Sequence, residues 1–154
     1  MPPRLHGMLK IFIYGKNEKE LSHISKCVGE YCDDKKGMTV IYSTCNQNNL
    51  LEYIDQRKYY GLYVLGLPSE SDINSNDFAL EIRKHDPRAF IVFVAENFDF
   101  DNLTMVKGTE IMDYVEKNAC DFSDRLHECI AVANDRYRNV LERDYDKMDF
   151  KLAG

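Results

Sequence analysis

The sequence predicts an α/β fold in which a parallel sheet of five strands is covered by helices on both faces. Short apolar runs alternate with amphipathic helical patterns five times along the chain, and this alternation is typical of consecutive βα units with right-handed crossovers. The central runs, such as Gly61-Leu-Tyr-Val-Leu65, are almost continuously apolar, as expected for strands buried on both faces. A length of 154 residues suits one domain of this kind.

Each expected element rests on a local pattern. Apolar and β-branched runs predict strands at 9–14, 38–42, 61–65, 90–94 and 111–115. Asn17 followed by Glu20 resembles a capping box that opens the first helix. Further helices are expected over 46–57, around 78–82 after a polar loop at 68–75, more weakly over 98–107, and from Phe122 onward. The last of these carries the most regular apolar stripe, which runs to Leu141.

Composition excludes several classes of function. The formal net charge of −6 disfavours binding to nucleic acid by this domain, and no apolar run approaches the ~18 residues of a membrane span. A single glycine follows the first strand, which disfavours a nucleotide-binding loop, and no cofactor is expected. The five cysteines are odd in number and irregularly spaced, which favours reduced thiols in the cytoplasm.

Two groups of histidine and cysteine are candidate metal ligands. They are His23, Cys27 and Cys32 on the first helix and His127 with Cys129 on the last. Neither group has the paired spacing of a zinc site, so we expect no metal and interpret the buried thiols as small apolar side chains. No base accompanies a cysteine in a pattern typical of a nucleophile.

One stretch of the chain resembles a known family. The block Asp72–Pro87, the strand Phe90–Val94 and the segment Ile111–Lys117 resemble the receiver domain of response regulators of the accessory-gene-regulator and competence type. The similarity covers 9–141 and is most specific over 61–117. It implies a flavodoxin-like (CheY-like) three-layer sandwich with strand order 2-1-3-4-5. It also implies a receiver-like domain over 9–143 and a C-terminal LytTR domain. Two prolines and the lack of an apolar run predict a leader or tag over 1–8, and the loss of helical periodicity predicts the start of a linker over 144–154.

The resemblance also implies a phosphorylation site, but this chain departs from it. The phosphoacceptor aspartate falls on Gly66, the pair of Mg²⁺-binding acids on Gly15 and Lys16, and the hydroxyl residue on Ala95. The lysine that ends the fifth strand is retained as Lys117 and the switch aromatic as Tyr114. Three nearby acids are candidate substitute acceptors, and we interpret them as solvated loop and cap residues: Glu70, Asp72 and Asp77.

Two lysines near the lost acids leave a question open. Lys16 and Lys117 should repel each other, so one is expected to turn to solvent or to pair with a loop acid such as Glu70. The alternative is a pocket that binds an anion.

The sequence therefore predicts an atypical receiver domain that is not an enzyme and regulates transcription through protein contacts. The resemblance implies a homodimer formed through the fourth helix, fifth strand and fifth helix, and a histidine kinase or another regulator as partner. DNA would be bound by the LytTR domain, while this domain would contact neither nucleic acid nor membrane. A stand-alone receiver-like adaptor and a flavodoxin-like domain that binds a small ligand or an anion remain alternatives.

Overall fold

The computed structural model describes residues 7–33, 37–66, 73–96 and 110–153, with side chains left out at 73–76 and 145–153. The strands are β1 (Leu9–Tyr14), β2 (Met38–Thr44), β3 (Gly61–Gly66), β4 (Phe90–Ala95) and β5 (Asp113–Glu116). The helices are α1 (Glu18–Asp33), α2 (Gln47–Asp55), α3 (Ile73–His85) and α5 (Phe122–Ala153). The helix expected over 98–107 lies outside the described residues.

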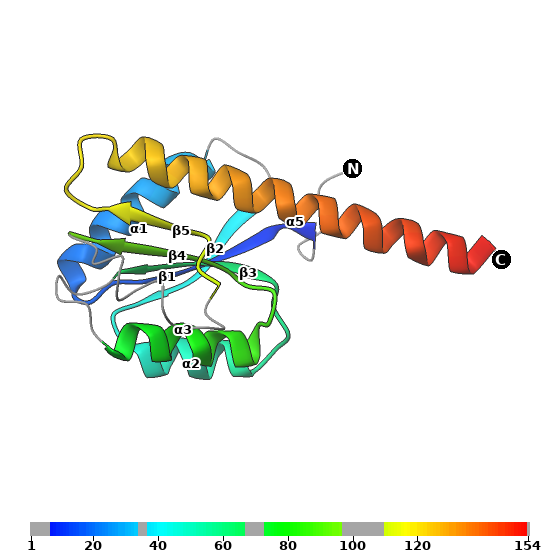
Figure 1. Cartoon of the computed structure of the whole chain (residues 1–154), viewed down its shortest axis with the longest axis horizontal. Coiled ribbons are helices and arrows are strands. Elements are labelled where there is room, and N and C mark those ends of the chain that lie inside the picture. Colours follow the sequence, from blue (N-terminus) through cyan, green and yellow to red (C-terminus); the bar gives the residue numbers. More distant parts are fainter. Residues whose placement is uncertain (1–6, 34–36, 67–72, 97–109, 154) are drawn as a thin grey trace.

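The five strands form one parallel sheet in the order β2-β1-β3-β4-β5, which confirms the predicted topology. Helices α1 and α5 cover one face, and α2 and α3 cover the other (Figure 1). Every residue of β3 and β4 is buried, because both faces of these central strands are covered by helices. The register places Gly66, the last residue of β3, opposite Val94, and Ala95, the last residue of β4, opposite Glu116.

Two apolar cores lie on the two sides of the sheet. Alternate strand residues point to opposite faces, so Val64 packs with Ile24 of α1 and Ile130 of α5, while Tyr63 packs with Ile54 of α2. The resulting three layers hold the carboxyl ends of all five strands at one edge of the sheet. This edge is where a parallel α/β sheet carries its functional side chains.

Two element boundaries differ from the sequence-based expectation. Helix α3 begins at Ile73, inside the stretch 68–75 that was expected to be a loop, because Ser and Asn are well accepted in the first turn of a helix as well as in loops. Strand β5 begins at Asp113, two residues after the expected start at Ile111. The backbone N–H of Met112 still donates to the Ile91 carbonyl at 2.8 Å, so the chain reaches β4 before the ladder begins.

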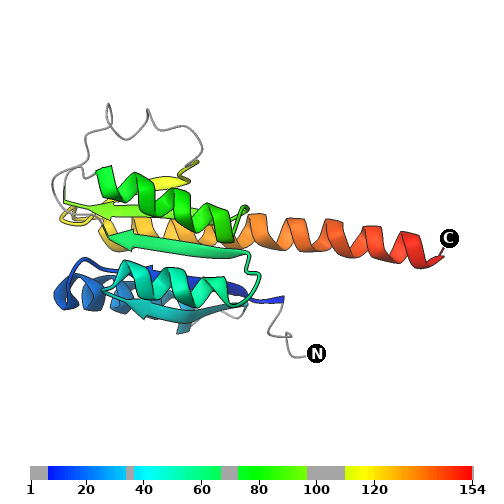
Figure 2. The ribbon, with the colours of Figure 1, turned by 90° about the horizontal axis from the view of Figure 1, so that it is seen from below.

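Helix α5 extends well past the sheet. The periodicity of its apolar residues was expected to end near Arg143, yet the helical backbone continues to Ala153. Figures 1 and 2 show that its carboxyl-terminal part projects beyond the other elements. Because no other described element lies beside that part, it needs no apolar stripe, and the Arg, Glu, Lys and Met residues there favour helix by intrinsic propensity.

A buried carboxyl group lies near the opposite, amino-terminal edge of the sheet. Asp86 is 1% exposed, and its Oδ2 accepts hydrogen bonds from the Gly61 backbone N–H at 2.9 Å and the Tyr63 hydroxyl at 3.0 Å. Burial raises the pKa of Asp86 to about 6. This group fixes the start of β3, on the side of the sheet away from the candidate site.

The helices of the described residues do not have the length and apolar character of membrane spans. Within the described ranges, every helix is either too short or too polar to cross a bilayer.

Candidate functional site at the carboxyl edge of the sheet

The structure brings the predicted site positions to one edge. Gly15 and Lys16 follow β1, Gly66 ends β3, Ala95 ends β4, and Lys117 follows β5. The Lys117 backbone N–H donates to the Ala95 carbonyl at 2.8 Å, which places the lysine beside the end of β4. The topology therefore places these residues together at the carboxyl edge of the sheet.

The acid at the centre of this edge is Glu20, in the first turn of α1. Its side chain is 1% exposed. Its Oε1 accepts the Lys16 backbone N–H at 2.9 Å, and its Oε2 lies 3.0 Å from the Lys117 Nζ. The Lys16 Nζ lies 3.9 Å from the same Oε2. A carboxylate buried to this degree needs hydrogen bonds and a counter-charge, and Glu20 has both.

The local sequence explains how Glu20 reaches this position. The Asn17 Oδ1 accepts the Glu20 backbone N–H at 2.9 Å, which confirms the helix start predicted from the capping-box pattern. In a capping box the glutamate would bond the N–H of the capping residue itself, whereas Glu20 bonds the preceding N–H, that of Lys16. The Glu20 carboxylate therefore lies closer to the carboxyl ends of the strands than a capping box would place it.

Glu20 occupies the space above Gly66. A Cβ atom placed on Gly66 would overlap the Glu20 Oε1, and it would lie 2.7 Å from the Glu20 Cδ and 3.2 Å from the Tyr14 carbonyl oxygen. Heavy atoms cannot approach this closely without a shift. The absence of a side chain at Gly66 is therefore what makes room for the Glu20 carboxylate.

Gly15 has a related role. A Cβ atom there would lie 2.7 Å from the Leu21 Cα, a backbone atom of α1 that cannot move aside independently. Close approach of two backbones is a standard reason for glycine. Gly15 thus allows α1 to pack directly against the end of β1, close to Gly66.

Within the described residues, the Lys117 side chain has two acidic partners. The Lys117 side chain is 15% exposed and pairs with Glu20 and, at 3.5 Å, with the Glu96 Oε1. The expected loop partner, Glu70, lies outside the described residues, as does Asp72. Two acids, Glu20 and Glu96, therefore lie at this edge of the sheet, at positions other than those to which the resemblance assigns acids.

Ala95 ends β4 next to Lys117, whereas Tyr114 packs on the face of the sheet that α2 and α3 cover. Ala95 is 1% exposed and presents only a methyl group, so it supplies no hydroxyl. Tyr114 is half-buried, its ring packs edge-on against Phe93 with centroids 5.8 Å apart, and burial raises the pKa of its hydroxyl. Asp77, the third acid weighed as a substitute acceptor, is exposed on α3 and does not line the pocket beside Lys117.

A pocket opens beside the Glu20–Lys117 pair. Its lining combines four lysines and two glutamates with polar residues of α1 and of the connection after β5: Lys16, Asn17, Lys19, Glu20, Ser22, His23, Lys26, Glu96, Lys117 and Asn118. Lysine cannot ligate a divalent cation, and the described part of the chain holds no group of three metal-ligating side chains. The chemistry of this lining suits an anion better than a cation.

The histidines and cysteines of the two groups make contacts within the fold. The His127 Nε2 lies 3.0 Å from the Cys27 carbonyl oxygen and 3.6 Å from the Cys27 Sγ, which joins α5 to α1. His23 stacks on Phe122 with centroids 4.9 Å apart. Burial raises the pKa of Cys129 to about 12 and that of Cys32 to about 11, so neither thiol is an active nucleophile at neutral pH.

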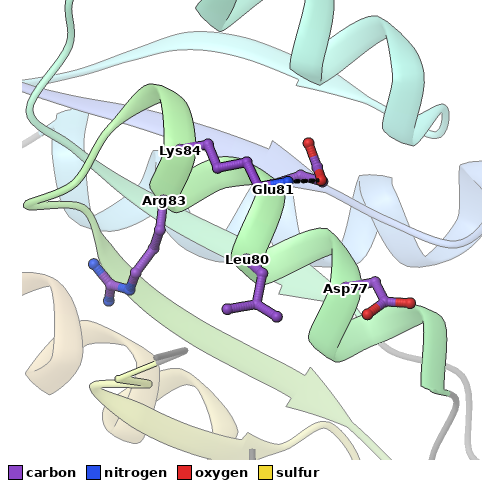
Figure 3. A pocket seen from close by; sticks show the side chains of 5 residues that line it. All are labelled: Asp77, Leu80, Glu81, Arg83 and Lys84. Atoms are coloured by element: carbon purple, nitrogen blue, oxygen red, sulfur yellow. Dashed lines mark hydrogen bonds and ion pairs between the residues drawn. The ribbon is translucent and has the colours of Figure 1, made fainter. Parts of the chain in front are cut away.

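A second pocket lies along α3, where Figure 3 shows five side chains from that one helix. Glu81 accepts from the Lys84 Nζ at 2.6 Å, and the Arg83 guanidinium donates to the Glu110 carbonyl at 2.8 Å. These contacts join residues close in sequence or fix the segment before β5. They bring no nucleophile next to a base.

Comparison with known proteins supports the interpretation of the fold. No family model matches the chain. Curated relatives include accessory gene regulator protein A of Staphylococcus epidermidis, 27% identical over 93% of this chain and 61% of the relative, and that of Staphylococcus aureus, 29% identical over 88% and 58%. The chain thus spans about three fifths of the length of these relatives.

Solved structures give the same answer for the fold. A response regulator receiver domain protein from Clostridium thermocellum superposes with a TM-score of 0.68 at 16% identity, covering 86% of this chain and 99% of that one. The signal receiver domain of an HD domain-containing protein from Pseudomonas fluorescens gives 0.65 at 13% identity, covering 86% and 98%. The chain has the fold of response-regulator receiver domains, and its resemblance to the receivers of the accessory-gene-regulator type is confirmed.

Proposed function

We propose that this chain is an atypical receiver domain that acts in signal transduction through protein contacts and does not accept a phosphoryl group at the usual position. The observation that carries the proposal is the Glu20 carboxylate above Gly66. The residue assigned to the acceptor has no side chain, and the space such a side chain would need is occupied by an acid that is hydrogen-bonded and ion-paired.

The chemistry of phosphoryl transfer explains why the substitutions matter together. A carboxylate nucleophile attacks phosphorus while a Mg²⁺ ion and a lysine offset the negative charge of the transferred group. Gly66 provides no nucleophile, and neither Gly15 nor Lys16 can ligate Mg²⁺. Glu20 itself is a poor substitute, because it is 1% exposed and both of its oxygens are engaged.

Regulation would then depend on partners. We infer a homodimer and contact with a histidine kinase or another regulator, in the cytoplasm. The remaining two fifths of the curated relatives' length is where a LytTR DNA-binding domain would lie. The fourth helix of the proposed dimer contact lies outside the described residues. Light scattering against concentration tests the dimer, and a monomer at every concentration would contradict it.

Incubation with acetyl phosphate and Mg²⁺, followed by intact mass measurement, tests the central proposal. We expect no added phosphoryl group, while a receiver domain that retains its acceptor aspartate gains one under the same conditions. A hydroxylamine-sensitive adduct on the chain would overturn the proposal. The Glu20→Gln variant would then show whether Glu20 is the acceptor.

A second candidate function rests on the pocket that four lysines line. A small anion bound there would make the domain a ligand sensor. Thermal unfolding in inorganic phosphate and in chloride at equal ionic strength distinguishes specific binding from general salt effects. A specific site predicts a higher melting temperature in phosphate, and the rise should be absent in the Lys26→Gln variant but kept in Lys58→Gln, which changes an exposed lysine outside the pocket lining.

A further inference from the structure

We propose that Glu20 is an internal carboxylate that replaces the acceptor side chain, so that residues 20 and 66 exclude each other and the Lys117 ion pair exists without any phosphodonor or metal. This inference rests on the proposed function, since it describes what fills a site that no longer takes phosphate. It assigns a role to Glu20, which the resemblance does not use.

The Glu20 carboxylate and a side chain at residue 66 would compete for the same space. The Glu20 Oε1 overlaps the place of a Cβ on Gly66, and the Glu20 Cδ lies 2.7 Å from it. The carboxylate cannot easily give way, because the Lys16 backbone N–H and the Lys117 Nζ hold its two oxygens. Any side chain at residue 66 must therefore displace Glu20 from both partners.

Glu20 and Lys117 neutralise each other's charge in a mostly buried place. Lys117 is 15% exposed and Glu20 is 1% exposed, so each would be costly to leave without the other. Among the described residues, the other acid that pairs with Lys117 is Glu96, which is 40% exposed and lies 3.5 Å away. Glu20 is thus the buried counter-charge of Lys117, which is the part that an acceptor carboxylate on β3 would play.

The Glu20–Lys117 ion pair also connects distant elements of the fold. Glu20 comes from α1, Lys117 follows β5, and the Lys117 backbone N–H bonds the end of β4. The Glu20–Lys117 pair therefore joins α1 to the ends of β4 and β5 within the folded chain itself. Contacts made at this edge would depend on folding alone, and removal of Mg²⁺ or of a phosphodonor would leave them unchanged.

A double-mutant cycle between residues 20 and 66 tests the proposal. Gly66→Ala, Glu20→Ala and the double variant are compared by urea unfolding. Overpacking a buried site costs about tenfold or more in the folding equilibrium constant, so we expect that loss for Gly66→Ala in the natural background. In the Glu20→Ala background, where the space is free, the same substitution should cost much less. Equal losses in both backgrounds would overturn the proposal.

A matched control separates this effect from a general cost of removing glycine. A Cβ atom on Gly29 of α1 meets nothing within 4 Å, so Gly29→Ala should be neutral or slightly stabilising, as alanine is in a helix. If Gly66→Ala fails to fold while the double variant with Glu20→Ala folds, the exclusion is upheld. If both fail to fold, the steric conflict does not come from Glu20 and the proposal is wrong.

This experiment and the phosphorylation assay fail independently. A phosphoryl adduct on the natural chain would overturn the proposed function, whereas absence of coupling between residues 20 and 66 would overturn only the role of Glu20. A heteronuclear NMR spectrum adds a second measurement. The Lys117 amide and ammonium signals should be unchanged when EDTA or Mg²⁺ is added and should shift in Glu20→Gln, which keeps the volume and removes the charge.

Discussion

Neutralising Glu20 tests how strongly the buried ion pair contributes to stability. At the 3.0 Å separation of the Glu20 Oε2 and the Lys117 Nζ, the attraction is about 5–6 kcal/mol at an effective dielectric constant of about 20. Desolvation opposes this gain, and removing one partner of a buried pair generally costs about 3–5 kcal/mol. Because Lys117 keeps some attraction to Glu96, we expect Glu20→Gln to cost about 2–3 kcal/mol.

The assay is urea unfolding at neutral pH and low salt for Glu20→Gln, Lys117→Met and the double variant. The two single substitutions should each destabilise the fold, and the double variant should recover about 2 kcal/mol relative to their sum. Lys16→Met provides the control, because the Lys16 Nζ lies 3.9 Å from the same oxygen and its side chain is 28% exposed. That substitution should cost less than about 1 kcal/mol.

A coupling below about 0.5 kcal/mol between Glu20 and Lys117 is what independent sites give, and it would refute this reasoning. A Lys16→Met loss as large as that of Lys117→Met would also contradict it, since the structure ranks the two lysines by distance and burial.

Three further outcomes are expected. The raised pKa of Asp86, about 6 against 3.8, means that the folded protein keeps a proton that the unfolded chain loses, so this group's contribution to stability falls as pH rises from about 4 to 6. The stability of Asp86→Asn relative to the natural protein should therefore rise by about 2 kcal/mol across that window in urea titrations, and a flat difference would contradict the assignment. Gly37 has φ of +98° and faces the Arg138 guanidinium, so Gly37→Ala should lower the unfolding free energy by about 1 kcal/mol or more, and an unchanged midpoint would count against it. In alkylation of the native protein, exposed Cys120 should react well before Cys129, whose pKa is raised to about 12; the reverse order would show that the burial of Cys129 is wrong.

The fold was predictable because its signals are local and repeated. Strands β3 and β4 are apolar at almost every position, and α5 repeats its apolar residues at helical spacing as far as Leu141. Those patterns depend only on which faces are covered, and burial in the structure follows them. The errors fall where the pattern is silent: the first turn of α3 and the polar extension of α5 are helical for reasons of propensity and capping, not of apolar periodicity.

The site was only partly predictable because its central contact is not local. The positions Gly66, Ala95 and Lys117 followed from the resemblance, since each ends a strand or directly follows one. The capping pattern marked Glu20 as a residue of the first helical turn, yet nothing in the sequence shows that its carboxylate lies above β3. A signal in the sequence was the glycine at residue 66 together with Glu20 in the first turn of α1. These two residues can be connected only once the structure shows that α1 packs against Gly15.

The glycines and charged residues at this edge form one arrangement, although they are far apart along the sequence. Glycine at residue 15 lets α1 approach the sheet, and glycine at residue 66 leaves room for the acid that α1 carries. The same acid binds the backbone N–H of Lys16 and the ammonium of Lys117. It follows that changing Gly66 to aspartate alone should not create an acceptor, because the new carboxylate would meet Glu20 in the same space and the two like charges would repel. An acceptor site would require Glu20 to be shortened in the same variant and acids to be introduced at residues 15 and 16, where the resemblance assigns them.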